Sequence, residues 1–176
     1  MWNEIKVLTL RLLRGSKKSD SEKNTYDYWN TRWSLKLRED NLDPKKREKI
    51  VWIVKNLMNK YDCESVLEVG CGADAPLRDL ENAAHLDFSI KALKRSKLSS
   101  FIYADITKRI PVPAKTFDAS FCSCCLMHLP DQALASACAE VSRVTKKVVI
   151  LNEGDGRTWA AYFPSLSCEE IGGRLR

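Results

Sequence analysis

The sequence feature that most constrains the fold is residues 65–74, which read Ser-Val-Leu-Glu-Val-Gly-Cys-Gly-Ala-Asp. A short apolar run that contains Glu68 leads directly into the turn Gly70-Cys71-Gly72. Glycine has no Cβ, so the backbone of such a turn can bend sharply and admit a bulky group close to it. In open α/β sheets, ligands bind at turns that follow the carboxyl ends of strands. The stretch therefore predicts a strand that leads into a binding loop, although an isolated Gly-x-Gly is also typical of an ordinary strand-to-loop turn.

Further apolar runs follow along the chain, and acids mark the ends of two of them. Asp87 closes the second run and Asp105 follows the third, while residues 147–152 are almost entirely β-branched or apolar, as a buried parallel strand should be. Before the first run, Asp43-Pro44 is typical of a helix start, with Asp as N-cap and Pro at the first helical position. Strands that alternate with helices indicate an α/β domain with a parallel sheet. The five predicted strands are residues 65–69, 83–87, 101–104, 118–122 and 147–152.

These pieces, from about residue 43 to residue 153, together resemble the class I S-adenosylmethionine-dependent methyltransferases. The likeness is greatest to the small-molecule type whose first motif reads Leu-Glu-Val-Gly-Cys-Gly. The resemblance implies a doubly wound, mostly parallel, Rossmann-like sheet with strand order 3-2-1-4-5. It also implies an enzyme (EC 2.1.1 type) that transfers the methyl group of S-adenosylmethionine to a small-molecule acceptor. One departure is Asp74, which stands where the family often has a third glycine and brings a carboxylate near the methionine end of the ligand.

The resemblance also assigns roles to single residues. Asp87 matches the family's acid at the end of the second strand, which grips the ribose hydroxyls, and an ionised carboxylate has two acceptor oxygens for a vicinal diol. The alternative for Asp87 is a helix N-cap, although Ser89 is as good a cap. Glu68 is predicted to accept hydrogen bonds from ribose hydroxyls, Phe88 to stack on adenine, and Asp105 to accept from the adenine amino group. The predicted cofactor-binding residues are Glu68, Gly70, Cys71, Gly72, Asp87, Phe88, Asp105, Ile106 and Cys122.

Two further features point to the acceptor side. Residues 26–33 contain four large aromatic rings, and methyltransferases of this type use an N-terminal helix as a lid over cofactor and substrate. The candidates for this lid are Tyr28, Trp29 and Arg32, although such a dense run of rings is also typical of a packing patch. His128 matches a histidine that is common at this place in the family. It is the only residue that we predict to be catalytic. It acts either as a general base or by fixing its loop through hydrogen bonds.

The charge of the chain is unevenly distributed. The net charge is +6, to which residues 1–60 contribute +7 and the remainder −1. We expect a basic segment over residues 1–42, made of a loosely amphipathic helix over residues 2–13, a linker and the aromatic lid, followed by a methyltransferase domain over residues 43–176. A basic arm of this kind can attract nucleic acid or an anionic membrane surface, or simply form a solvated face. Removal of residues 1–20 is predicted to leave a folded domain.

Composition excludes several other classes of protein. The seven cysteines are odd in number and scattered, which argues against a disulfide framework and favours a reducing cytosol. With only two histidines in the chain, no metal site is predicted. No apolar run approaches the roughly 20 residues of a membrane span, so no transmembrane segment is expected.

The segment after the fifth predicted strand is short. Only 23 residues follow Glu153, too few for the helix and two strands that the family adds there. We therefore expect some or all of these last strands to be lacking. Helices over residues 159–163 and 168–175 are expected in a tail that folds over the exposed edge of residues 147–152, which gives a monomer or weak dimer.

Two rival interpretations remain open. The shortened end leaves a non-catalytic or partner-dependent methyltransferase-like module as the alternative to an enzyme. A nucleotide-binding oxidoreductase is the second rival, but the Gly-x-Gly turn lacks a following glycine at the dinucleotide spacing, and Asp105 would then have no role.

Overall fold

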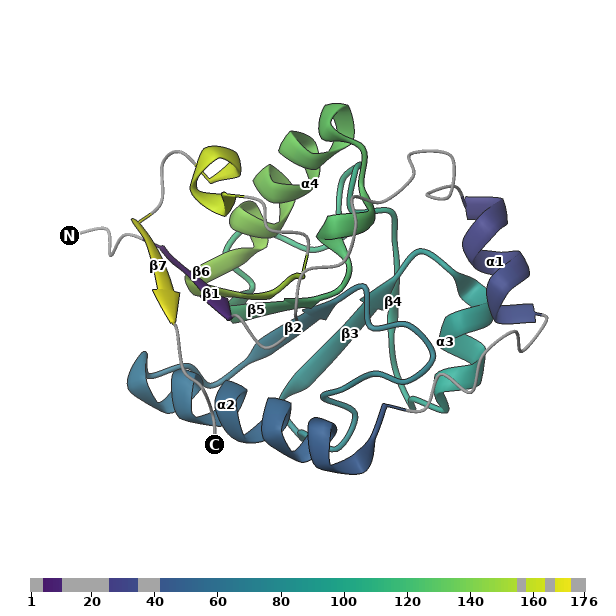
Figure 1. Cartoon of the computed structure of the whole chain (residues 1–176), viewed down its shortest axis with the longest axis horizontal. Helices are drawn as coiled ribbons and strands as arrows, with labels where there is room; N and C mark the ends of the chain where they lie inside the picture. The colour runs from purple at the N-terminus through teal and green to yellow at the C-terminus, as the bar shows by residue number, and fades with distance from the viewer. Residues whose placement is uncertain (1–4, 11–25, 35–41, 155–157, 164–166, 172–176) are drawn as a thin grey trace.

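The computed structural model describes residues 5–10, 26–34, 42–154, 158–163 and 167–171. The described strands are β1 (Lys6–Leu10), β2 (Val66–Val69), β3 (Ala83–Asp87), β4 (Ile102–Tyr103), β5 (Phe117–Ser123), β6 (Thr145–Asn152) and β7 (Ser167–Ile171). The described helices are α1 (Tyr26–Ser34), α2 (Pro44–Lys60), α3 (Ile90–Ser96) and α4 (Asp131–Val144), with the short 3₁₀ helices η2 (Leu126–His128) and η3 (Trp159–Tyr162). The strands form one sheet in the order β4-β3-β2-β5-β6-β1-β7, and every strand pairing is parallel (Figure 1).

Helices cover both faces of this sheet. In Figure 1, α2 lies below the sheet and α4 above it. Alternate residues of β6 serve the two layers, because successive side chains of a strand point to opposite faces. Val148 and Ile150 belong to the core on the α2 side, whereas Val149 and Leu151 belong to the core on the α4 side. All four are fully buried, which explains why the strand has no polar alternation in its sequence.

The start of α2 confirms the predicted helix signal. The Asp43 carboxylate accepts a hydrogen bond from the Lys46 amide at 3.2 Å, and Pro44 occupies the first turn. The apolar residues of α2 then recur at helical spacing and are buried against the sheet. These residues are Ile50, Ile53, Val54, Leu57 and Met58.

The predicted fold class and central strand order are confirmed. The five strands expected from the sequence are β2, β3, β4, β5 and β6, and they lie in the expected order 3-2-1-4-5. Their carboxyl ends therefore meet at one edge of the sheet, where the loops that follow them lie close together.

The predicted helix over residues 2–13 is wrong, because residues 6–10 form β1. This strand pairs with β6 on one side and β7 on the other. Val7 and Leu8 are both fully buried, Val7 toward the α4 side and Leu8 toward the α2 side. Apolar residues that spoil the polar face of a helix are what a strand buried on both faces requires. A division after residue 42 would separate β1 from the sheet to which it belongs, and deletion of residues 1–20 would remove a core strand.

The end of the chain also differs from the prediction. A strand, β7, lies where residues 168–175 were predicted to be helical, and η3 is a short 3₁₀ turn within the other predicted helix. The edge of β6 is covered by β1 rather than by the tail, and β7 extends the sheet beyond β1. Two strands thus lie beyond the fifth predicted strand, where strands were expected to be lacking. One is β1 and the other is β7, which are far apart in the sequence. The oligomeric state stays a prediction.

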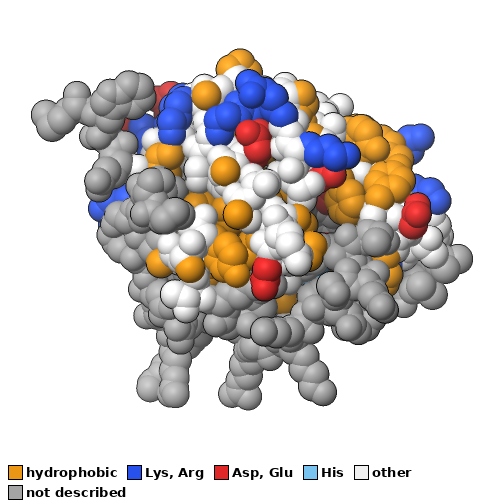
Figure 2. Space-filling model, turned by 90° about the horizontal axis from the view of Figure 1, so that it is seen from above, with side chains coloured by type: hydrophobic (Ala, Val, Ile, Leu, Met, Phe, Trp, Pro, Cys, Tyr) orange, Lys and Arg blue, Asp and Glu red, His pale blue; other side chains and the backbone are white. Residues whose placement is uncertain are grey.

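The described helices and one outer face of the molecule bear on the expectations about membrane and charge. Within the described ranges, none of the helices has the length and apolar character that crossing a bilayer requires. On the face seen from above α4, Lys and Arg side chains gather along one edge, and apolar side chains reach the surface at several places (Figure 2).

Candidate cofactor site

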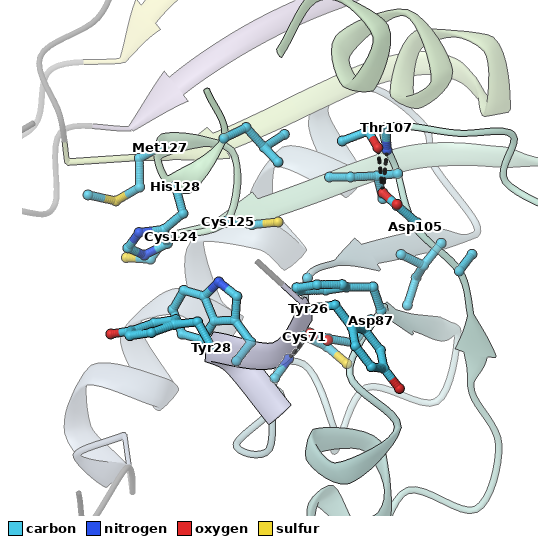
Figure 3. A pocket seen from close by; sticks show the side chains of 18 of the residues that line it. Tyr26, Tyr28, Cys71, Asp87, Asp105, Thr107, Cys124, Cys125, Met127 and His128 are labelled. Atoms are coloured by element: carbon cyan, nitrogen blue, oxygen red, sulfur yellow. Dashed lines mark hydrogen bonds between the residues drawn. The ribbon is translucent and has the colours of Figure 1, made fainter. Parts of the chain in front are cut away.

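A large cavity of about 1290 Å³ lies at the carboxyl edge of the sheet. The loops after β2, β3, β4 and β5 line it, and α1 closes one side. Asp87 and Asp105 lie toward one end of this cavity, and His128 and Met127 lie toward the other (Figure 3). Ligand pockets commonly occupy about 300–1,000 Å³. The cavity therefore has room for a cofactor and a second molecule.

The glycine loop, residues 70–74, follows β2 and uses its two glycines for different reasons. Gly70 and Gly72 have φ angles of +67° and +61°, in the left-handed region that side chains disfavour. A Cβ at Gly70 would collide with the Cys125 side chain, and a Cβ at Gly72 would lie 3.3 Å from the Trp33 ring. Gly70 thus permits two loops to pack together, while Gly72 keeps the cavity open beneath α1.

Asp87 joins the glycine loop to β3. Its carboxylate accepts hydrogen bonds from the amides of Gly72 at 2.9 Å and Ser89 at 2.7 Å. Burial raises the pKa of Asp87, and the backbone hydrogen bonds oppose that rise. A carboxylate has about four lone-pair sites, so Asp87 keeps capacity for a ligand on the cavity side. The N-cap of α3 is Ser89, whose hydroxyl accepts a hydrogen bond from the Ala92 amide. Asp87 is therefore not the helix N-cap, which was the alternative role considered for it.

Glu68 does not line the cavity, so the ribose role predicted for it is wrong. The register of the sheet sets Glu68 directly beside His85, and its carboxylate lies 2.7 Å from His85 Nδ1. Both of its oxygens also accept from the Leu77 amide, at 3.2 and 3.3 Å. Burial raises the pKa of Glu68, and His85 opposes the rise. Glu68 thus ties the chain beyond the glycine loop to the sheet from inside the protein.

Asp74, which replaces the third glycine of the family pattern, is held by basic partners at the rim of the cavity. Its carboxylate forms ion pairs with Arg47 and Arg78 and accepts a hydrogen bond from the Leu42 amide. The two guanidinium groups balance its charge. The loop therefore presents no uncompensated carboxylate to a ligand at this point.

The end of the cavity near Asp87 has aromatic and polar walls. Phe88, Asp105 and Ile106 all line it, and the contacts predicted for them with adenine stay predictions. Asp105 Oδ1 accepts from the amide of Thr107 at 2.9 Å and from its hydroxyl at 2.7 Å, which fixes the orientation of the carboxylate. Cys122, in contrast, is fully buried within β5 and does not reach the cavity, so its predicted cofactor contact is wrong.

Helix α1 brings the predicted lid residues Tyr28, Trp29 and Arg32 to the cavity. Its buried Asn30 anchors it, because Asn30 Oδ1 accepts from the Ser89 hydroxyl at 2.7 Å. Two ring contacts then fix its course over the site. Tyr26 meets Phe88 edge-on at 6.1 Å between centroids, and Trp29 meets the His128 ring at 5.0 Å. The helix therefore spans the cavity from the Asp87 end to the His128 end.

The cysteine loop, residues 123–128, follows β5 and carries His128. Cys124 has a φ angle of +51°, which few residues other than glycine adopt. Burial raises the pKa values of Cys71 and Cys125 well above the usual range of a thiol. Because the thiolate is the nucleophilic form, neither cysteine is suited to covalent catalysis. His128 lines the cavity from this loop, as predicted.

Glu153 holds the cysteine loop, a role that the sequence interpretation missed. One oxygen accepts from the amides of Cys125 at 3.1 Å and Leu126 at 3.2 Å, and the other accepts from the Met127 amide at 3.0 Å. Glu153 is buried at the end of β6, next to β5 in the sheet. A carboxylate directly after a buried strand was the available signal. The sequence alone did not show which amides it would meet.

Cysteine, histidine and acidic side chains are the usual protein ligands of metal ions. Over the ranges that the structure describes, no three of them are grouped so as to hold a metal ion. The cavity is lined by carboxylates, which are hydrogen-bond acceptors, and by aromatic side chains. This combination suits an organic ligand.

Comparison with known proteins adds the family. Residues 67–151, from β2 to β6, match the family model described as a methyltransferase domain. The matched segment, which holds the central strands and the loops of the cavity, is similar to the class I S-adenosylmethionine-dependent methyltransferases. S-adenosylmethionine is the cofactor of that family. No curated protein matches the chain.

Solved structures of methyltransferases and of related proteins share the fold of this chain at low sequence identity. Magnesium protoporphyrin IX methyltransferase from Synechocystis PCC 6803, solved with bound S-adenosylmethionine, has a TM-score of 0.55 and 16% identity over 75% of each chain. PH0226 protein from Pyrococcus horikoshii OT3 has a TM-score of 0.51 and 22% identity over 66% of this chain and 60% of its own. The methyltransferase domain of bacterial CtHen1 has a TM-score of 0.50 and 19% identity over 62% of this chain and 66% of its own. These likenesses establish the fold and leave the substrate open.

Proposed function

We propose that this methyltransferase binds S-adenosylmethionine in the cavity and transfers its methyl group to a small-molecule acceptor. The observation that carries the proposal is the glycine loop beside Asp87. The Gly72 backbone approaches the cavity without a Cβ, next to a buried carboxylate that keeps acceptor capacity for a ligand. The residues present therefore fit a ligand with a vicinal diol, which the ribose of S-adenosylmethionine supplies.

The neighbouring residues supply the rest of a nucleoside site. Asp87 accepts from the ribose hydroxyls, and Phe88 offers a ring face to adenine. Thr107 uses only Oδ1 of Asp105, and Oδ2, which lies 3.6 Å from Lys108 Nζ, has a further lone pair for the adenine amino group. Ile106, which also lines this end, offers its amide to a ring nitrogen of adenine. A nucleoside thus fills the Asp87 end of the cavity.

The opposite end is where the acceptor is held. Bound S-adenosylmethionine supplies an electrophilic methyl group on its sulfonium sulfur. The chain contributes alignment and exclusion of water, for which the rings of Tyr28 and Trp29 form a cover. His128 lines this end and, as a neutral imidazole, can take a proton from an acceptor that must lose one.

Isothermal titration with S-adenosylhomocysteine tests the cofactor assignment. Asp87→Ala should weaken binding by roughly 1–3 kcal/mol, since ribose hydroxyls lose their partner in a site built for them. Asp79→Ala, which removes an exposed acid outside the cavity, should leave affinity unchanged. A wild-type chain that binds NAD but neither S-adenosylmethionine nor S-adenosylhomocysteine would overturn the proposal.

The proposed location is the cytoplasm. Cys63, Cys71, Cys122, Cys124 and Cys125 are thiols rather than half-cystines, which supports a reducing compartment. Fluorescence microscopy of the tagged full chain in its native cells measures this directly, and a signal confined to an oxidising compartment would contradict it.

A further inference from the structure

The outer face of α2 combines charge and an exposed indole in a way that the methyltransferase site does not use. The helix carries six basic residues and a single acid, Glu48. Its inner face is buried in the core, so the polar residues are confined to the side that faces away from the sheet. Trp52 lies in the middle of that outer side with 59% of its surface exposed. Its indole therefore offers an apolar ring face and a polar N–H to a partner at this surface.

The spacing gathers these groups into one surface, which we call the α2 face. Lys45, Lys49, Trp52, Asn56 and Asn59 recur at alternating intervals of four and three residues, so they share one side of the helix. All five are exposed. At 1.5 Å per residue this row runs for about 21 Å. Two more exposed lysines, Lys55 and Lys60, flank the row on its two sides.

The chemistry of the face distinguishes between anionic partners. Lysine is a compact point charge, whereas arginine provides the planar, bidentate fork that suits individual phosphates and bases. The one arginine of α2, Arg47, is turned away to Asp74 and the Ala75 carbonyl, which leaves an array of lysines. On the opposite side of the sheet, Arg143 is likewise taken up, by Glu140 and the Val112 carbonyl. The α2 face is thus suited to a diffuse negative surface rather than to single phosphates.

The indole points to the same kind of partner. Tryptophan is enriched where a protein meets the lipid headgroups, because its ring is apolar and its N–H is polar. Lysines beside it can extend along the surface and keep their ammonium groups at the headgroups. The face is a helix side that projects from the sheet (Figure 1), so it can lie against a flat surface.

We propose that the α2 face docks the protein peripherally on an anionic membrane surface, with Trp52 entering the headgroup layer and the surrounding lysines facing acidic lipids. Each lysine near an anionic leaflet contributes roughly a fivefold change in binding, so several together give reversible attachment. The attachment should weaken as salt rises, because exposed charges are screened.

Co-sedimentation of the full chain with lipid vesicles tests this proposal. Vesicles of phosphatidylcholine with 30% phosphatidylserine should bind the protein at low salt, and pure phosphatidylcholine vesicles should not. Lys55→Glu should weaken binding about tenfold or more, since it removes one positive charge and adds a negative one. The matched control is Lys94→Glu, the same charge change on an exposed residue of α3, which should alter binding less than threefold.

Tryptophan emission provides a second measurement. Anionic vesicles should shift the emission of the wild type to shorter wavelength, and Trp52→Phe should abolish that shift. Equal binding to neutral and anionic vesicles, or equal loss in Lys55→Glu and Lys94→Glu, would overturn the proposal. So would salt-sensitive binding to polyuridylate that Trp52→Phe weakens, in the absence of vesicle binding, because the face would then serve nucleic acid. Since none of these residues lines the cavity, titration with S-adenosylhomocysteine should be unchanged in every variant.

Discussion

The glycine loop and the cysteine loop line the same cavity, but the buried carboxylates that hold them differ in whether they also face the cavity. Each follows a central strand, and each is tied to the end of the next strand by a buried carboxylate. In the glycine loop, Asp87 accepts from the Gly72 amide and faces the cavity as well. In the cysteine loop, Glu153 accepts from three successive amides and does not line the cavity.

This difference separates two roles that a buried acid can have beside a ligand. Asp87 divides its acceptor capacity between its own loop and whatever enters the cavity. Glu153 is fully engaged in shaping the loop that carries Met127 and His128. We therefore expect substitutions of Asp87 to act mainly on ligand affinity, and substitutions of Glu153 to act mainly on stability and loop order.

The largest effect is expected where the two loops touch. Gly70→Ala should lower the free energy of unfolding by at least about 3 kcal/mol, because it adds a collision with Cys125 to a left-handed backbone. Chemical denaturation measures the loss. In a Cys125→Gly background the collision is gone, and only the backbone strain of roughly 1–2 kcal/mol should remain. If the losses are equal in both backgrounds, the loops do not depend on their contact.

Glu153→Gln should cost about 2–3 kcal/mol of unfolding free energy. A neutral amide offers one acceptor oxygen to three amides, so at least one buried donor loses its partner. Hydrogen exchange at residues 125–127 should accelerate more than in β5. The control is Glu81→Gln, the same substitution at an exposed position away from this loop, which should change the unfolding free energy by less than about 0.5 kcal/mol. Unchanged exchange at residues 125–127 would show that Glu153 does not order the loop.

Asp87→Asn should weaken S-adenosylhomocysteine binding by roughly 1–2 kcal/mol at neutral pH while changing stability less than Glu153→Gln does. In the wild type, affinity should fall as pH drops through the raised pKa of Asp87, because the protonated acid loses acceptor capacity. That fall should begin at a higher pH than the usual aspartate value of 3.8 and be missing in Asp87→Asn. Calorimetric titration between about pH 4 and pH 8 measures both curves.

The raised pKa of Asp87 affects the free energy of unfolding in the opposite direction to ligand affinity. The folded state holds the Asp87 proton at pH values where the unfolded state has released it, so the contribution of Asp87 to unfolding free energy decreases as pH rises from 3.8 through the folded-state pKa. The difference between wild type and Asp87→Asn isolates this contribution. A contribution that increases with pH over the same range would mean that the carboxylate is stabilised in its ionised form.

The smallest effect is expected for Cys124→Gly. Glycine relieves the left-handed strain but adds freedom to the unfolded chain, so the free energy of unfolding should rise by up to about 1 kcal/mol. Lys97→Gly is the matched control, since Lys97 has a φ of +59° at the end of α3, outside the cavity. Equal gains in both variants, with unchanged ligand affinity, would mean that the strain at Cys124 is unrelated to the site.

The parts of the molecule that the sequence predicted correctly are those with a local signal. The five central strands end in recognisable turns or acids, and Asp87 follows from its place in that series. Glu68 was misplaced because its partner is set by strand register. Leu67 and Val69 around it are fully buried, and only the pairing with β3 puts His85 beside it. A polar residue in each of two adjacent apolar strands was the sign of that internal pair.

The parts that were missed depend on contacts between distant segments. Residues 6–10 carry apolar side chains that fit either a poor helix or a strand covered on both faces, and their neighbours β6 and β7 decide the outcome. Glu153 likewise acquires its role only when β6 lies beside β5. No pattern within either segment contains this information.

The place of β1 between β6 and β7 has a consequence for how the chain folds. Lys6 pairs with Val148 and with Ser167, so both strands that β1 contacts lie far from it along the sequence. Contacts at such sequence separation slow folding, because a long loop must close before they form. Until then Val7 and Leu8, which are fully buried in the native sheet, remain accessible to other chains. The slow phase of refolding and the tendency to aggregate should therefore share one origin, the late docking of a single five-residue strand.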